Sequence, residues 1–267
     1  MEELLRFEQV SYHYDSGDGR EALFPVSVSL MMGEKIAVLG SNGAGKSTFF
    51  LLANGVLCPC SGTIALQGEP VGKREKQRMQ LRRNIGLVFQ DPDVQLLAGT
   101  VEEEISFGPM NLGLPEEEVR RRVEAAMESL QLTEYRGRGP QYLSGGEKRR
   151  VAIADVLAME PKMMLLDEPS SNLDPAGRAL LEDTLESLHQ KGITLVVATH
   201  DVDFAWRWAE RVLVFHQGRL ERDASPSEVF ADKELLSRCG LEQPMLWKVA
   251  QALGVPVPKY PEELSKQ

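Results

Sequence analysis

The chain has 267 residues, of which 42% are hydrophobic and 26% are charged, a length and composition typical of one large folded domain or two small ones. Forty acidic residues outnumber thirty basic ones and give a net charge of −10, which argues against a general affinity for nucleic acid, because a polyanionic backbone favours basic surfaces. No run approaches the roughly 20 apolar residues that cross a bilayer, and the three cysteines are too few for a disulfide framework, so we expect a soluble protein of a reducing compartment.

Two kinds of strand pattern occur in the first third of the chain. Alternating apolar and polar residues predict strands with one buried face, whereas the nearly all-apolar run at 35–40 predicts a strand in the middle of a sheet that is covered on both sides. We expect a hairpin turn at Met31–Glu34, a helix from Thr48 onward, and pairing between the last two strands of this third. The predicted strands cover residues 4–14, 23–30, 35–40, 62–67 and 85–89.

The rest of the chain alternates between helical and strand patterns. Residues 96–159 have a mostly helical pattern, which is clearest over 116–131, and the more polar tail at 226–267 is predicted to form a small C-terminal appendage. The apolar residues that share one face of the helix at 116–131 are Val119, Val123, Ala126 and Leu130. The predicted strands cover 163–167, 193–200 and 211–220, and the predicted helices between them cover 175–190 and 202–209. Strands that alternate with helices indicate a parallel sheet.

A glycine-rich segment, Gly40–Ser47, matches the pattern G-x-x-x-x-G-K-[ST] and lies between a predicted apolar strand and a predicted helix, which is the context that supports this motif. The backbone N–H groups of such a loop surround phosphates, Lys46 supplies positive charge to the β- and γ-phosphates, and Ser47 supplies a hydroxyl to Mg²⁺. We therefore predict a nucleotide site here. Its predicted residues are Gly40, Ser41, Asn42, Gly43, Ala44, Gly45, Lys46, Ser47 and Thr48.

Two carboxylates, Asp167 and Glu168, end the apolar run at 163–167. In α/β sheets this end of a strand faces the ligand. Asp167 is suited to hold Mg²⁺ through its water shell, and Glu168 is suited to polarise the attacking water. The pair therefore favours nucleotide hydrolysis over binding alone.

A second feature that suits phosphate lies at Ser144–Glu147, just before a predicted helix. Ser144 and Glu147 are three residues apart, the spacing of a capping box, while Gly145 and Gly146 would expose N–H groups at the positive end of the helix dipole. These two interpretations are compatible. Because the glycine-rich loop already surrounds its own nucleotide, we expect the second surface to serve the nucleotide of another copy.

The order and spacing of these motifs make residues 5–225 resemble the ATP-binding-cassette ATPases. The resemblance is carried by the segment Leu143, Ser144, Gly145, Gly146 and Glu147 before a helix, by Asp167 and Glu168 at the end of a strand, by Ser171, Asn172, Leu173 and Asp174, and by His200 after another apolar strand. It implies an α/β fold of the P-loop NTPase class, with a RecA-like parallel-sheet core, an antiparallel β-subdomain and a helical subdomain at 96–159. The ATPase domain would then cover 1–225, followed by the appendage at 226–267.

The resemblance also implies how the site works. Two cassettes face each other head to tail around two ATP molecules, each held by one glycine-rich loop and by the Leu143–Glu147 segment of the opposite copy. Gln90 would lie near Mg²⁺ and the attacking water, so that Ser47, Asp167 and Gln90 are the predicted Mg²⁺ residues. His200 would contact the γ-phosphate, and Tyr14 would stack on adenine, with Tyr12 as a weaker candidate. The segment from Ser171 to Asp174 would signal across the dimer.

A narrower resemblance lies at 86–114, GLVFQDPDVQLLAGTVEEEISFGPMNLGL. This stretch resembles the ATPase subunits of energy-coupling-factor importers, and Gln95 matches a second glutamine of that family. The phrases LSGGEKRRVAIA, SNLDP and VVATHDVDFAW favour the cobalt/nickel branch over the vitamin branch. Two positions depart from the pattern: Asp155 stands where most relatives carry Gly or Arg, and Ser170-Ser171 replaces the commoner Thr followed by a small residue. These departures leave open how the helix that carries Asp155 packs.

These resemblances predict an ATP-hydrolysing subunit of a membrane importer for cobalt or nickel, with a vitamin importer as the alternative. The expected partners are a second ATPase subunit, preferably a copy of this chain, an integral membrane coupling subunit and a substrate-binding membrane subunit, but not nucleic acid. The expected location is the cytoplasmic face of the cell membrane, as a peripheral protein. A soluble cassette ATPase of DNA repair or translation is a more distant alternative, because no long insertion separates the motifs and the chain carries a single set of them.

Overall fold

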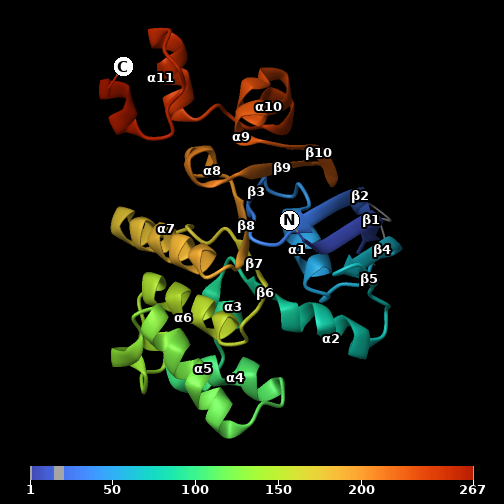
Figure 1. Cartoon of the computed structure of the whole chain (residues 1–267), viewed down its shortest axis with the longest axis vertical. Helices are drawn as coiled ribbons and strands as arrows, with labels where there is room; N and C mark the ends of the chain where they lie inside the picture. Colours follow the sequence, from blue (N-terminus) through green and yellow to red (C-terminus); the bar gives the residue numbers. More distant parts are fainter. Residues whose placement is uncertain (1, 15–20, 267) are drawn as a thin grey trace.

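The computed structural model of the chain describes residues 2–14 and 21–266. Two sheets lie side by side at its centre (Figure 1). The first is antiparallel in the order β2-β1-β4-β5, and the second has the order β10-β9-β3-β8-β7-β6, parallel except for β10. The strands are β1 (Glu3–His13), β2 (Glu21–Met31), β3 (Lys35–Leu39), β4 (Ser61–Leu66), β5 (Glu69–Pro70), β6 (Ile85–Val88), β7 (Met163–Asp167), β8 (Thr194–Thr199), β9 (Arg211–His216) and β10 (Arg219–Ala224). The predicted α/β class and the predicted parallel core are confirmed.

Helices cover the parallel sheet and form a separate lobe (Figure 1). The α-helices are α1 (Lys46–Ala53), α2 (Glu75–Asn84), α3 (Pro92–Gln95), α4 (Val101–Asn111), α5 (Glu116–Ser129), α6 (Gly145–Leu157), α7 (Pro175–Gln190), α8 (Val202–Trp208), α9 (Pro226–Ala231), α10 (Lys233–Cys239) and α11 (Met245–Leu253), with short 3₁₀ turns at Thr133–Tyr135, Pro140–Tyr142 and Pro261–Lys266. The helical character of 96–159 is confirmed, and the predicted apolar face of α5 is buried. Within the described part of the chain, no helix combines the length and the apolar character that a membrane span requires.

Two predicted strand pairings are wrong. The turn after β2 does not close a hairpin, because β3 leaves the first sheet and pairs with β8 and β9, and the predicted pair at 62–67 and 85–89 is divided between the two sheets as β4 and β6. Burial explains both results: β3 and β6 are apolar on both faces and require the covered parallel sheet, whereas β2 and β4 have exposed residues.

The third correction concerns 211–220, predicted as one strand. The chain reverses there between β9 and β10, because Gln217 and Gly218 both adopt left-handed φ values of 48° and 76°. Two consecutive residues of this kind form the tight turn that suits a two-residue hairpin. The polar residues of β10 are therefore explained by an edge strand rather than by the end of a buried one.

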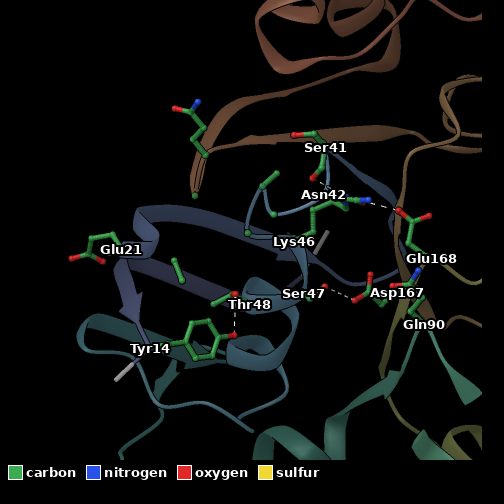
Figure 2. Close-up of a pocket in the computed structure, with 16 residues that line it drawn as sticks. Tyr14, Glu21, Ser41, Asn42, Lys46, Ser47, Thr48, Gln90, Asp167 and Glu168 are labelled. Carbon is green, nitrogen blue, oxygen red and sulfur yellow. Dashed lines mark hydrogen bonds and ion pairs between the residues drawn. The ribbon is translucent and has the colours of Figure 1, made fainter. Parts of the chain in front are cut away.

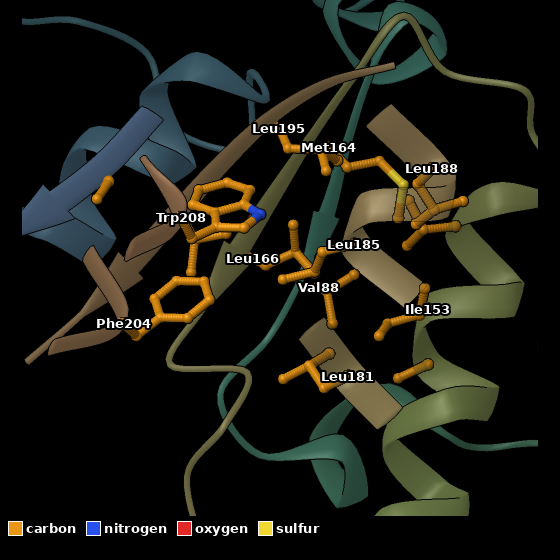
Figure 3. Close-up of a cluster of buried hydrophobic side chains, with 14 of the residues drawn as sticks. Val88, Ile153, Met164, Leu166, Leu181, Leu185, Leu188, Leu195, Phe204 and Trp208 are labelled. Atoms are coloured by element: carbon orange, nitrogen blue, oxygen red, sulfur yellow. The ribbon is translucent and has the colours of Figure 1, made fainter. Parts of the chain in front are cut away.

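Two hydrophobic clusters hold these layers together. One lies between the two sheets, where the Phe49 ring packs 4.9 Å from Phe7 and 5.2 Å from Phe215. The other lies between the parallel sheet and helices α6 to α8 (Figure 3), where Leu166 of β7 and Leu185 of α7 are fully buried. Burial of apolar side chains stabilises the fold by about 25 cal/mol per Å² of apolar area. These clusters therefore hold in place the strand ends on which the site is built.

The C-terminal helices α9 to α11 pack onto the parallel-sheet side of the molecule. Phe230 and Trp247 lie 6.1 and 5.0 Å from the Trp206 ring of α8, and Trp206 Nε1 donates to the carbonyl of Pro258 at 2.8 Å. Trp206 thus packs against the aromatic side chains of the tail and also binds its backbone. The apolar residues of the tail therefore belong to the same cluster as the sheet.

Candidate functional site: a phosphate loop at the edge of the parallel sheet

The loop Gly40–Ser47, called the phosphate loop below, is shaped by glycines between β3 and α1. Gly40 has a φ of 155°, and a Cβ there would lie 2.4 Å from the carbonyl oxygen of Phe215, so only glycine fits beside β9. Gly45 has a φ of 103° and immediately precedes α1. The loop therefore passes close to the sheet and brings its N–H groups to the end of a helix that favours anions.

A cavity of about 870 Å³ opens over the phosphate loop (Figure 2). Asp167 and Glu168 reach it from the end of β7, and Gln90 reaches it from just beyond β6, because parallel strands that are neighbours end at the same edge of a sheet. The predicted residues that line the cavity are Tyr14, Ser41, Asn42, Gly43, Ala44, Gly45, Lys46, Ser47, Thr48, Gln90, Asp167 and Glu168. The structure thus brings together residues that are far apart in the sequence.

Lys46 provides a buried positive charge in this cavity. Its side chain is 7% exposed, and Nζ donates to the carbonyls of Gly40 at 2.6 Å and Ser41 at 3.4 Å. Nζ also lies 3.8 Å from Glu168 Oε1. The lysine is therefore held against its own loop with its charge directed at the space that a phosphate would occupy.

Ser47 and Asp167 form the second polar contact of the cavity. Ser47 Oγ donates to Asp167 Oδ2 at 2.6 Å, and Gln90 lines the same wall. A hydroxyl, a carboxylate and an amide oxygen are the hard ligands that Mg²⁺ prefers, and Mg²⁺ usually takes few protein ligands and keeps waters or phosphates for the others. The donor set therefore fits Mg²⁺, although the described residues contain no cluster of three or more His, Cys, Asp and Glu side chains.

Glu168 is buried, and a hydrogen bond with His200 holds its carboxylate. Its side chain is 7% exposed, Oε2 lies 2.8 Å from His200 Nδ1, and Oε1 has no hydrogen-bond partner among the described residues. Its φ of 45° is in the left-handed region, which for a residue other than glycine is uncommon and typical of functional sites. His200 follows β8, and its side chain is 72% exposed, so the pair connects the cavity to the surface.

Tyr14 lies at the open side of the cavity, at its boundary with the first sheet. Its hydroxyl is 3.2 Å from Thr48 Oγ1, and its ring meets Tyr12 edge to face at 5.0 Å. Tyr12 does not line the cavity. Of the two tyrosines considered from the sequence, Tyr14 is therefore the one that lines the cavity.

The Leu143–Glu147 segment is outside this cavity. Ser144 caps α6 in the predicted capping box: Ser144 Oγ accepts from the N–H of Glu147 at 3.4 Å, and Glu147 Oε2 accepts from the N–H of Ser144 at 2.6 Å. The bond from the Ser144 backbone lowers the pKa of Glu147. The segment lines a separate cavity of about 190 Å³ that shares no residue with the first, so one chain does not bring its two phosphate-binding features together.

The predicted signalling loop, Ser171–Asp174, lies beside the Leu143–Glu147 segment. Leu173 lines the smaller cavity together with Ser144 and Gly146, Asn172 has a φ of 61°, and Asp174 Oδ1 caps α7 by accepting from the N–H of Gly177 at 2.7 Å. The loop follows Glu168 within a few residues. It therefore connects the two cavities along the chain.

Sequence reasoning missed several residues around the site. Glu21, Gln217 and Gly218 line the main cavity, and Arg149 donates to the carbonyls of Phe89 and Gln90. The first three lie in no local motif. The only sequence signal for Arg149 was its place in the basic run after Glu147.

The comparisons with known proteins agree with this geometry. Residues 23–171 match the family model for ABC transporter. The energy-coupling factor transporter ATP-binding protein EcfA2 of Methanospirillum hungatei is 44% identical over 253 residues, which are 95% of this chain, while the chain spans 63% of that protein.

Two solved structures have the same fold. CbiO1 of Clostridium perfringens, part of the ABC transporter complex CbiONQ, superposes with a TM-score of 0.79 at 39% identity, covering 96% of this chain and all of that one. A dimeric ATP-binding cassette bound to ADP and phosphate, MJ0796, superposes with a TM-score of 0.74 at 29% identity, covering 84% of this chain and 99% of that one.

Proposed function

The chain belongs to the ABC transporter family of ATP-hydrolysing proteins, and from this premise we propose that it is the ATPase subunit of an energy-coupling-factor importer for cobalt or nickel ions. The importer type is supported by the likeness to EcfA2, and the metal ion by the phrases that follow Leu143 and Asp167. The chain would act peripherally, on the cytoplasmic face of the membrane. Residues 1–225 would form the ATPase domain, and 226–267 an appendage that packs on it.

The cavity supports hydrolysis of ATP by an in-line attack of water. Lys46 and the N–H groups of the phosphate loop would hold the phosphates, and Ser47, Asp167 and Gln90 would hold Mg²⁺, which neutralises charge on the β- and γ-phosphates. Glu168 would accept a proton from the attacking water. The water oxygen bonds to the γ-phosphorus as the bond between the γ-phosphorus and the bridging oxygen breaks, and ADP leaves with that oxygen. His200 keeps Oε2 of Glu168 occupied, so Oε1, which lies 3.8 Å from Lys46 Nζ, is the oxygen available for that proton.

The second phosphate-binding feature supports a head-to-tail dimer. The first turn of α6 lines a different cavity from the one over the phosphate loop, and the N–H groups of Gly145 and Gly146 would complete the site of a partner copy. The likeness to a dimeric cassette supports the same arrangement. Ser171–Asp174 would then lie between the two sites.

A groove of about 520 Å³ provides a docking surface for the membrane subunit. It is lined by side chains of α2, α4 and α6, among them Phe107 and Met159. Large apolar side chains are exposed on the same lobe, with exposed fractions of 65% for Phe107, 83% for Leu97 and 63% for Met110. Apolar exposure of this kind is typical of an interaction surface.

The experiment that tests this function is an affinity capture from solubilised native membranes. The bait is the Glu168→Gln variant held with ATP, and the captured proteins are identified by mass spectrometry. One ATPase species together with membrane subunits that bind cobalt or nickel supports the proposal. A second ATPase with vitamin-binding subunits identifies a vitamin importer, and capture of only ribosomal or DNA-repair proteins overturns the transporter assignment.

A further inference from the structure

The segment that carries Gln90 is held by α6 rather than by its own strand. Arg149 of α6 donates from Nη1 to the carbonyl of Phe89 at 2.7 Å and from Nη2 to the carbonyl of Gln90 at 2.5 Å. The N–H of Phe89 in turn donates to Gln95 Oε1 at 3.2 Å. Three backbone groups of Phe89 and Gln90, just beyond β6, are therefore fixed by side chains.

Gln95 is itself attached to α6. Its Nε2 donates to the carbonyl of Ala152 at 3.0 Å and to Asp155 Oδ2 at 3.1 Å. Arg149 and Gln95 thus bind Phe89 and Gln90 to one helix at three points. This is the helix whose first turn carries the capping box of Ser144.

Arg149 is costly to keep in this position. It is 4% exposed, and within the described part of the chain its Nε has no hydrogen-bond partner. Its Nη groups bond to neutral carbonyls and not to a carboxylate. Burial of a cation that is bonded only to neutral groups costs free energy and does not by itself stabilise a fold. The effect of this contact is therefore to hold the backbone of Phe89 and Gln90 in place.

We propose that Arg149 is a positioning residue for ATP hydrolysis, which fixes the backbone of Gln90 to α6 and so sets where the Gln90 side chain lies in the cavity. This inference rests on the function proposed above. It links the two halves of the dimer: a shift of α6 caused by a nucleotide at its first turn moves Gln90 in the chain's own cavity. The fork of a guanidinium can bridge two neighbouring carbonyls, which the single ammonium of lysine cannot do in the same geometry.

The test compares Arg149→Lys with Arg78→Lys. Arg78 is the control, because its Nη1 also donates to two neighbouring carbonyls, Gly55 at 2.9 Å and Val56 at 3.2 Å, and because it does not line the cavity that Gln90 lines. For Arg149→Lys we expect a loss of roughly 10- to 100-fold in kcat, the scale of a small misplacement at an active site, with the Kd for ATP within about twofold of wild type. We expect Arg78→Lys to leave kcat and Kd unchanged.

A double-mutant cycle separates positioning from a merely structural role. If Arg149 acts through Gln90, Arg149→Lys adds almost nothing to the loss caused by Gln90→Ala. Gln95→Leu removes the bond from Phe89 together with the bonds to Ala152 and Asp155, but it leaves both Arg149 bonds in place. It replaces Arg149→Lys in the cycle if that variant does not fold. It should lower kcat less and be equally non-additive with Gln90→Ala.

Each outcome decides one proposal. Independent, additive losses, or a weaker Kd for ATP with kcat unchanged, overturn the positioning role. A wild-type protein that binds ATP but does not hydrolyse it, alone or with its captured membrane partners, overturns the proposed function instead. Wild-type hydrolysis with a normal Arg149→Lys variant overturns the positioning role alone.

Discussion

The phosphate loop and the first turn of helix α6 both have features that suit phosphate, but only the phosphate loop is surrounded by charged and polar side chains of the same chain that could act on a nucleotide. Around the phosphate loop, two pairs of side chains lie within 4 Å of each other in a single cavity: Lys46 with Glu168, and Ser47 with Asp167. At the start of α6, the charged and polar side chains satisfy the helix end itself through the capping box. The difference indicates that one chain can bind a nucleotide, whereas the contribution of α6 requires something outside the chain.

The largest effect on hydrolysis should come from substitution of Glu168. Glu168→Gln keeps the size of the side chain and an oxygen for His200, but it removes the group that accepts the proton of water. We expect hydrolysis to fall about 1000-fold, or about 4 kcal/mol in the activation barrier, with ATP binding retained. Phosphate release and equilibrium binding measure the two effects, and a variant with more than a tenth of the wild-type rate would contradict the role of Glu168.

The next effect concerns binding in a single chain. Lys46→Ala removes the buried cation that faces the phosphates, and we expect a loss of about 100-fold in ATP affinity, or about 3 kcal/mol. Lys35→Ala is the control, because Lys35 pairs with Glu186 at 3.3 Å outside the cavity. Equal losses in the two variants, measured by calorimetry, would show that general charge and not the cavity governs affinity.

The comparison also explains what could be predicted from the sequence. The phosphate loop is contiguous, and its flanking strand and helix are strongly patterned, so its residues and its place at the sheet edge followed from the sequence alone. The capping box of Ser144 is local as well. By contrast, Arg149 contacts Phe89 about 60 residues away, and no local pattern records a contact that only tertiary packing creates.

The errors in strand pairing have the same origin. Residues 62–67 and 85–89 each form a strand, but their partners, β1 for the first and β7 for the second, come from elsewhere in the chain. The buried faces of β6 contained the information that it belongs to the parallel sheet, because a strand without a polar face needs cover on both sides. Likewise, the polar residues of β10 indicate a strand at the edge of the sheet, and such a strand requires the chain to turn at Gln217 and Gly218.

A smaller effect should appear at the far end of α6, where Asp155 lies. Burial raises the pKa of Asp155 to about 6, with Glu104 acting in the same direction and the bond from Gln95 opposing it; Arg82 and Arg83 line the same groove. The folded state then holds the proton more tightly than the unfolded chain, so the contribution of Asp155 is fully present below pH 4 and is lost as the pH rises through about 6.

Asp155→Asn removes this dependence while it keeps an oxygen for Gln95. We expect the wild type to lose roughly 2 kcal/mol of unfolding free energy relative to the variant between pH 4 and 6.5, less than the full shift implies because the side chain is partly exposed. Urea unfolding of both proteins across this range measures the difference. A constant difference between the two proteins would mean that Asp155 does not change its protonation there.

The smallest effect distinguishes the two roles of Ser144. Ser144→Ala removes one half of the capping box on α6, and Ser225→Ala removes the same half of the equivalent box on α9, where Ser225 Oγ accepts from the N–H of Glu228 at 3.3 Å. Each should cost about 1 kcal/mol of unfolding free energy, because a helix N-cap is lost in both. Only Ser144→Ala should also lower hydrolysis, by several-fold at saturating ATP, because only α6 would face a nucleotide held by a second copy. If both variants hydrolyse ATP at the wild-type rate while losing the same stability, Ser144 is a cap and nothing more, and the first turn of α6 must act through the N–H groups of its glycines.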